Sequence, residues 1–334
     1  APAAQASMAG DPDPAIAALL RAATARGGNA GILHAGDMGS LGGAMGGRDV
    51  TDLPPEARQA KVQAAAKKVP GLKINAVFGR RRTPVLGGDL TSVKCNGEWL
   101  PLGLAVDDTS GLVLTVDRLS AEDAATVKEW LEPVAEAVHA ELLVSDDADA
   151  FKSVANDLGL EHQVCKGHVR RNTEAFIESM EPKVETDEDG SLAAIGVTPE
   201  QALKDLHRLG ELILSRQPEQ ESELEAMHHR YTGASPPGGG EKATNAYRLR
   251  LMYLDRWSLW RRLTRYRTWH GPKGETVDGT NNGCERAIGW WIKERYRAMR
   301  GYKRPKSAVN VSRLLAWCGN HLERGGADLA LLVV

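Results

Sequence analysis

The chain has 334 residues, with 42% hydrophobic and 26% charged content, which is typical of a globular protein large enough for two domains. No apolar run reaches 18 residues, and the N-terminus lacks a charged region followed by an apolar core. We therefore expect neither a helical membrane span nor a secretory signal. Four widely spaced cysteines are typical of reduced thiols, which predicts a cytoplasmic protein.

The net charge of −2 argues by itself against nucleic-acid binding, but the charge is unevenly distributed. Residues 241–306 contain 17 Lys and Arg against six Asp and Glu, so the rest of the chain is strongly acidic. Such asymmetry within one chain is a nonspecific indication of nucleic-acid binding.

Residues 1–83 are rich in Ala and Gly. We expect short helices at 13–26 and 56–68, and a Gly-rich linker at 37–47, so this segment is predicted to be partly flexible. It contains no zinc-finger or helix-turn-helix pattern.

Three antiparallel strands are predicted next, at 85–94, 98–106 and 112–118. Asn96-Gly97 is the strongest short hairpin signal in the chain. A helix capped by the Ser120–Asp123 segment then runs to about His139, and Pro133 within it predicts a kink or a break.

Two short strands follow, at 142–145 and 160–165, with one helix at 148–158 between them and another beginning at 169. The order β-β-β-α-β-α-β-α is that of the ribonuclease H-like fold. We therefore expect an α/β core over 84–177 with three antiparallel and two parallel strands.

No strand is predicted between residues 178 and 274. Residues 178–190 carry six carboxylates and are expected to form a surface loop. Helices are predicted at 198–216, 219–231 and 241–269. This pattern indicates an all-helical insertion, after which residues 275–315 complete the core and residues 316–334 form a C-terminal tail.

A late helix is expected to start after the turn at residues 278–283, with Thr280 or Asn281 as its cap, and to end at Gly301. Glu285, Ile288 and Ile292 share one face of this helix by their spacing. A neighbouring stripe carries four cations, namely Arg286, Lys293, Arg297 and Arg300. A solvated basic helix with a first-turn glutamate is the simpler explanation of this pattern alone.

Three acids are candidate metal ligands and catalytic residues. Asp89 lies in the middle of the first strand and Asp146 directly follows the fourth, and these strands are neighbours in a ribonuclease H-like sheet. Glu285 comes from a helix packed on the same region. Converging carboxylates repel one another unless cations neutralise them, and hard oxygen ligands favour Mg²⁺ or Mn²⁺. Two such ions about 4 Å apart can promote phosphodiester cleavage.

Structural roles are the alternatives for these acids. Asp89 can be an ordinary strand residue, although a carboxylate is unusual at that position. One of the adjacent Asp146 and Asp147 is expected to cap the following helix. We assign metal binding to Asp146, which directly follows the strand, and capping to Asp147.

Four segments together resemble the DDE transposases, especially the mutator-like branch of bacterial insertion-sequence enzymes. They are Gly88-Asp89-Leu-Thr, Val144-Ser-Asp146, Cys165-Lys-Gly-His168-Val-Arg-Arg-Asn172 and Thr280-Asn-Asn-Gly-Cys-Glu285-Arg, the last followed by Lys293, Arg295 and Arg300-Gly-Tyr. The resemblance covers about residues 84–315. No single segment is specific for this family, but the four segments in this order and at these spacings are.

This resemblance implies two divalent ions, DNA hydrolysis followed by strand transfer, and a homodimer or larger assembly on double-stranded DNA in the nucleoid. Family members usually carry an N-terminal DNA-binding domain, and none is evident here. Two other hypotheses remain open, a non-catalytic DNA-binding remnant and a ribonuclease H-like nuclease without strand transfer.

Two further groups of residues are secondary candidates. Cys165 and His168 form half of a zinc site at most, because no second pair has suitable spacing, so a structural role is favoured. In the helical insertion, Arg261, Arg262 and Arg265 are candidate DNA-backbone contacts. The tryptophans among them suit base stacking, with burial as the alternative.

Overall fold

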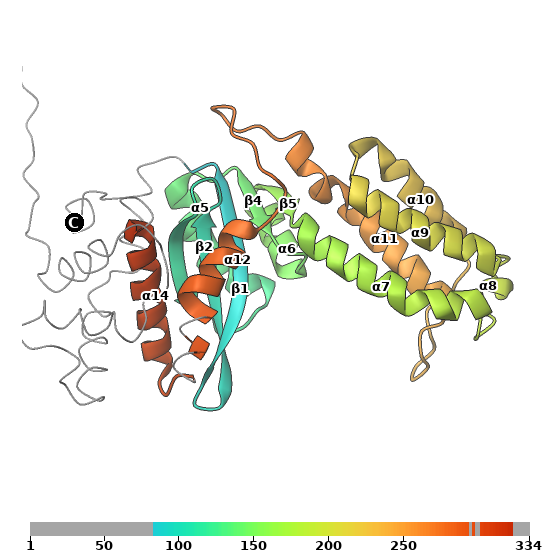
Figure 1. Cartoon of the computed structure of the whole chain (residues 1–334), viewed down its shortest axis with the longest axis horizontal. Coiled ribbons are helices and arrows are strands. Elements are labelled where there is room, and N and C mark those ends of the chain that lie inside the picture. Colours follow the sequence, from blue (N-terminus) through green and yellow to red (C-terminus); the bar gives the residue numbers. More distant parts are fainter. Residues whose placement is uncertain (1–82, 294–295, 298–300, 323–334) are drawn as a thin grey trace, which may run out of the picture. The chain divides into compact units, whose positions relative to one another are not determined.

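The computed structural model describes residues 83–293, 296–297 and 301–322 (Figure 1). Its strands form one five-stranded mixed sheet in the order β3-β2-β1-β4-β5, with three antiparallel and two parallel strands. The fold is therefore α/β, and the predicted succession of strands and helices is confirmed from β1 to α7. In the described part of the chain, no helix combines the length and apolar composition needed to cross a bilayer.

The chain divides into two compact units, which are described separately. The first unit comprises the residues up to Leu143, Asp149–Leu160 and the residues from Asn282 onward. The second unit comprises Val144–Ala148 and Glu161–Asn281. The helices predicted at 13–26 and 56–68 and the linker at 37–47 lie outside the described residues.

A long hairpin opens the first unit. Strand β1 (Val85–Cys95) pairs antiparallel with β2 (Glu98–Asp107), and β2 pairs in turn with β3 (Leu112–Arg118). Asn96 and Gly97 both have positive φ, at 53° and 89°, as a type I′ turn requires. The hairpin predicted from this dipeptide is confirmed.

One face of this sheet packs against α5 (Ala124–Val138) and α6 (Asp149–Asp157). Two glycines make the close approach possible. The buried ring of Phe151 lies against Gly88, and the ring of Trp130 lies against Gly103. Because Gly88 and Gly103 lack side chains, these aromatic rings can reach the backbone of the sheet.

We expect Gly103→Ala to destabilise the first unit by about 1–3 kcal/mol, the usual cost of overpacking. A Cβ atom at this position would lie 2.8 Å from the Trp130 ring, so the ring or the strand would have to move. Urea denaturation measures the loss. Gly239→Ala is the control, because nothing lies within 4 Å of a Cβ there. Equal stability of the two variants would contradict the expectation.

Helix α5 is capped within the predicted Ser120–Asp123 segment. Its N-cap is Asp123, whose carboxylate accepts a hydrogen bond from the Thr126 N–H at 2.9 Å. Pro133 lies inside the helix without ending it, so the predicted break is wrong. The continuous apolar face from Val127 to Val138 packs on the sheet and holds the helix together across the proline.

The Asp123 cap makes the stability of α5 depend on pH. Hydrogen bonding to Thr126 holds the pKa of Asp123 below its ordinary value. Its contribution is therefore present above the unfolded pKa, about 3.9, and is lost as pH falls through the lower folded value. We expect Asp123→Ala to lower the Tm at pH 7, and the difference from the parent protein to shrink below about pH 4. Ser120→Ala is the control and should change the Tm much less, because its exposed hydroxyl makes only a marginal contact with the Thr126 hydroxyl, at 3.5 Å.

The opposite face of the sheet is covered by segments from the C-terminal part of the chain (Figure 1). These are α12 (Asn282–Ala287), the π-helix η4 (Ile288–Lys293) and α14 (Pro305–Leu322). The core on this face contains Val93, Leu104, Cys284, Ile288, Ile292, Val309 and Val311. The apolar spacing predicted for the late helix therefore correctly identified its buried side.

The late helix itself is less regular than predicted. Its α-helical part ends at Ala287 and continues as a π-helix through Lys293. Gly301 has a φ of 103°, as expected for a residue that ends a helix. Residues 294–295 and 298–300 lie outside the described residues.

The second unit includes the end of β4 (Leu142–Ser145) and β5 (Glu161–Val164). Its helices are α7 (Lys166–Thr186), α8 (Ser191–Ala194), α9 (Pro199–Ser215), α10 (Glu221–Arg230) and α11 (Asn245–Leu263), with short 3-10 turns at Pro218–Gln220 and Arg265–Arg267. Their apolar faces form one core, which contains the buried Trp260, Tyr231 and Tyr253.

The acidic loop predicted at 178–190 is wrong, because α7 continues to Thr186. Met180 and Val184, four residues apart, are fully buried and anchor this half of the helix. Glu181, between them, is only half-buried, and Glu185 is exposed. The acidic composition therefore hid the helical spacing of the buried residues. Asp187 ends the helix in the left-handed conformation.

Candidate functional site

Asp89 lies in the central part of β1 and is half-buried. Alternation along the strand puts it on the same face as Val93, which is the face covered by α12 and η4. One carboxylate oxygen accepts a hydrogen bond from the Leu90 N–H at 2.8 Å. The backbone therefore fixes the orientation of this acid.

Glu285 lies in α12 and is also half-buried. Its neighbour Cys284 is fully buried against β2, where its thiol faces the Leu104 carbonyl at 4.0 Å. Burial raises the pKa of the Cys284 thiol well above its ordinary value, and the charges of Asp89, Asp108 and Glu285 raise it further. These three carboxylates thus concentrate negative charge around one neutral thiol in the first unit.

Asp108 was not recognised as part of this acidic region, because its sequence context is that of a turn after β2. Gly283 explains its position. A Cβ atom at Gly283 would lie 2.8 Å from an Asp108 carboxylate oxygen, so the glycine allows α12 to begin directly against this acid. The only local signal was the position of Asp108 at the end of a buried strand.

Lys293 lies closer to the sheet than predicted. It was expected on a stripe beside Glu285, but its ammonium group donates to the Ser92 carbonyl at 2.7 Å. An α-helical turn has about 3.6 residues and a π-turn about one more, so eight residues complete about two turns. The π-helix therefore returns Lys293 to the face of Glu285. Burial and Arg297 lower the pKa of Lys293, whereas Asp89 raises it.

Asp146 belongs to the second unit and follows β4 directly. Its carboxylate accepts a hydrogen bond from the Ala148 N–H at 3.1 Å, which shapes the turn before α6. Asp147, assigned to helix capping, makes an ion pair with Arg256 at 3.5 Å. Arg256 is almost fully buried in α11 and also donates to the Thr173 hydroxyl at 2.9 Å and pairs with Asp255. The Asp146 turn is thereby attached to the helices of its own unit.

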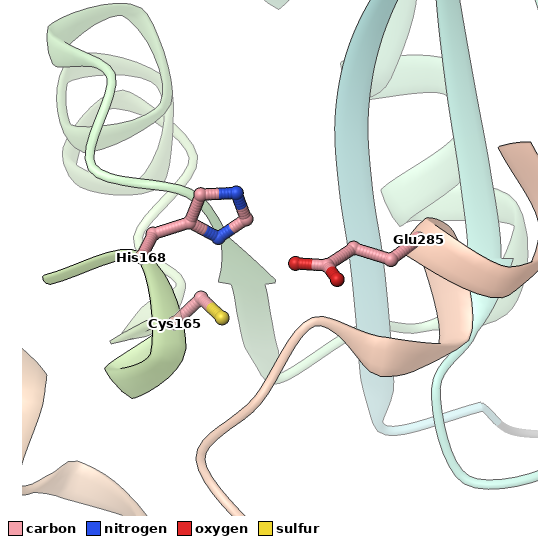
Figure 2. Close-up of side chains that lie close together, drawn as sticks. All are labelled: Cys165, His168 and Glu285. Carbon is pink, nitrogen blue, oxygen red and sulfur yellow. The ribbon is translucent and has the colours of Figure 1, made fainter. Parts of the chain in front are cut away.

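Cys165 and His168 lie at the start of α7 (Figure 2), where the thiol and a ring nitrogen are within 4.8 Å of each other. Cys165 is buried, and its sulfur accepts a hydrogen bond from the Asn281 N–H at 3.3 Å. The neighbouring Lys166 N–H donates to the Gly279 carbonyl at 2.9 Å. This part of α7 therefore holds the segment that leads into α12. Glu285, also labelled in Figure 2, belongs to the first unit.

The three arginines of the helical region have protein partners. Arg261 is exposed and pairs with Glu221 at 3.2 Å, and Arg265 pairs with Glu161 at 2.6 Å. Arg262 contacts His162 at 3.3 Å, and burial lowers its pKa. These acids offset part of the positive charge that the sequence indicated.

The prediction that the tryptophans of this region stack on bases is wrong for Trp260 and Trp269. Trp260 is fully buried and its indole N–H donates to the Gln217 carbonyl at 3.0 Å, and Trp269 is also buried. Trp257 is partly buried in the core and stacks on His228. Burial, the alternative considered for these residues, accounts for them.

Arg286 and Arg297, both predicted on the basic stripe, are exposed. The Arg286 side chain donates to the Asn282 carbonyl at 3.2 Å. Arg300 lies outside the described residues.

Comparison of the sequence with protein-family models finds no match, and comparison with curated proteins finds none either. The functional assignment therefore depends on the residues and contacts described above.

Proposed function

We propose that this protein is a DDE-type DNA transposase that cleaves phosphodiester bonds and transfers DNA strands with the help of two Mg²⁺ or Mn²⁺ ions. Asp89, Asp146 and Glu285 are its proposed metal ligands. The observation that carries the proposal is the packing of α12 on β2. Asp89 is paired with Leu104 in the strand register, and the thiol of Cys284, the neighbour of Glu285, lies 4.0 Å from the Leu104 carbonyl. A strand acid and an acid from a late helix have no evident structural reason to share this region.

The strand order supports the inclusion of Asp146. Strands β1 and β4 are neighbours in the sheet, Asp89 lies within β1, and Asp146 follows β4. Neighbouring strands bring their side chains to a common region of a sheet. The same order, with three antiparallel strands beside a parallel pair, is compatible with a ribonuclease H-like core. We infer that residues 178–274 form its helical insertion.

The donor set fits divalent magnesium or manganese. All three proposed ligands offer carboxylate oxygens, which hard cations prefer, and two half-buried acids in one region favour a bound cation. When bound, such ions activate a water or 3′-hydroxyl and stabilise the leaving oxygen.

The residues of the chain have separate roles in this proposal. The Leu90 N–H fixes one oxygen of Asp89 and leaves the other available. Lys293 offers a fixed positive charge beside Asp89, which can steady a phosphate oxygen. The neutral thiol of Cys284 packs α12 on β2 and so sets the position of Glu285.

Arg286 and Arg297 are the proposed contacts to the DNA backbone near this site, and Arg261, Arg262 and Arg265 are weaker candidates because of their protein partners. Two DNA ends must be joined in transposition, so the proposal includes a homodimer or larger assembly on double-stranded DNA and a location in the nucleoid.

The test is an assay of supercoiled plasmid with a labelled oligonucleotide that has a 3′-hydroxyl. We expect nicking that requires Mg²⁺ or Mn²⁺ and is absent with Ca²⁺ or EDTA, together with label joined to the plasmid. Nicking without joined product would identify a nuclease without strand transfer. Salt-dependent DNA binding without nicking at any metal concentration would reject catalysis and leave a DNA-binding remnant.

A further inference from the structure

The tip of the β1–β2 hairpin carries Trp99, which is 62% exposed, more than any other large hydrophobic side chain among the described residues. Trp99 lies opposite Lys94 in the hairpin register, and the Lys94 ammonium group is 5.2 Å from the centre of its ring. A single exposed aromatic residue requires no explanation by itself. The positively charged residues around Trp99, however, indicate that this surface binds a ligand.

A basic segment is fixed beside the hairpin. The Tyr302 N–H donates to the Lys94 carbonyl at 3.0 Å, and the Asn96 N–H donates to the Tyr302 carbonyl at 2.7 Å. The buried Tyr302 side chain anchors this pairing in the core. Lys303, Arg304 and Lys306 follow it directly and are exposed, at the point where α14 begins.

These elements lie at one end of the sheet (Figure 1). Glu98 is the one acid among the described residues of the hairpin tip. Lys94, Lys303, Arg304 and Lys306 therefore give this surface a positive net charge. The surface thus combines one exposed aromatic ring with several positive charges on a backbone held by hydrogen bonds. We call the surface formed by Trp99, Lys94, Lys303, Arg304 and Lys306 the hairpin surface.

We propose that the hairpin surface binds an unpaired DNA strand, with Trp99 stacking on a base and the cations contacting phosphates. Every base offers a flat π-face, so an exposed indole stacks on any sequence, and nearby cations follow the backbone. A protein partner is less well suited, because the exposed ring is not part of a broad apolar patch. The inference rests on the proposed function for its choice of DNA, and it adds a site separate from the carboxylates.

Fluorescence anisotropy of the full chain with a labelled single-stranded oligonucleotide tests the inference. We expect Trp99→Ala to weaken binding roughly tenfold and Trp99→Phe, which keeps a ring, to retain most of the affinity. Lys94→Gln should reduce the slope of log affinity against log salt by about 0.7, whereas Trp99→Ala should leave that slope unchanged. Leu254→Ala is the control, an exposed apolar residue on α11 in the second unit.

Single-strand affinity within twofold of the parent protein for Trp99→Ala would overturn the inference and leave an acidic protein as the candidate partner. Thermal melting checks that the variant is folded, which is expected for such an exposed position. The nicking assay on the same samples separates the two proposals. Binding that depends on Trp99, without nicking, would support single-strand binding by the hairpin surface and reject catalysis. Nicking, with binding that does not depend on Trp99, would support catalysis and reject single-strand binding by the hairpin surface.

Discussion

Glu285→Gln reduces metal-dependent nicking by about 10²- to 10³-fold if Glu285 is a metal ligand, since such a ligand supports several kcal/mol of transition-state stabilisation. Asp89→Asn should have an effect of the same size. Both substitutions keep the shape of the side chain, so the fold should persist. Initial nicking rates at saturating Mn²⁺ measure the loss. Asp149→Asn is the control, because this carboxylate is exposed at the start of α6.

Thermal stability gives an independent measurement of the same substitution. Without metal, removing one of two acids near each other relieves repulsion of about 1 kcal/mol, so we expect the Tm of Glu285→Gln to rise by about 2–4 °C. Added Mg²⁺ should raise the Tm of the parent protein, because it binds only the folded state, and should raise that of the variant less. A variant that still nicks DNA within threefold of the parent rate would reject the role of Glu285.

Arg256→Met is expected to destabilise the second unit by about 3–5 kcal/mol, the usual cost of removing one partner from a buried ion pair. Arg256 is 3% exposed, and its side chain joins Asp147 to Thr173 and Asp255. Loss of the guanidinium group leaves the carboxylate of Asp147 in a largely buried position without its cation. Urea denaturation followed by far-UV circular dichroism measures the change.

Two further variants make this expectation specific. Arg256→Lys should recover only part of the stability, because an ammonium group cannot reproduce the planar set of donors. The double variant Asp147→Asn with Arg256→Met should be more stable than Arg256→Met alone, since the two residues are coupled. Arg261→Met on the same helix is the control, because that side chain is mostly exposed. Equal losses at positions 256 and 261 would contradict the assignment.

Most strands of the sheet, and the helices between them, could be predicted because each has a strong local signal in the sequence. The Asn96-Gly97 turn indicated the hairpin, and the apolar residues of Leu112–Arg118 indicated β3. The second half of α7 was missed because the buried Met180 and Val184 are few among many acids. The cap of α5 could be assigned to the Ser120–Asp123 segment, and the structure identifies Asp123 within it.

The candidate site was only partly accessible to sequence reasoning. Asp89 could be selected because it lies in the middle of a strand that the expected fold places beside the fourth strand, and Glu285 could be selected from helical spacing. Lys293 was misplaced because a π-helix leaves no clear local signal and shifts every later residue around the axis. Asp108 and Arg256 were missed because their partners, Gly283 and Asp147, are distant in the sequence.

The division of the chain into interleaved segments has a consequence for its synthesis. The face of β1 and β2 that carries Val93 and Leu104 is covered by α12 and α14, which the ribosome makes after the whole second unit. Until then the nascent strands expose an apolar surface, and exposed apolar sheets are prone to aggregate. Fragments that stop before Asn282 should therefore need chaperones to stay in solution, although they contain every strand of the sheet.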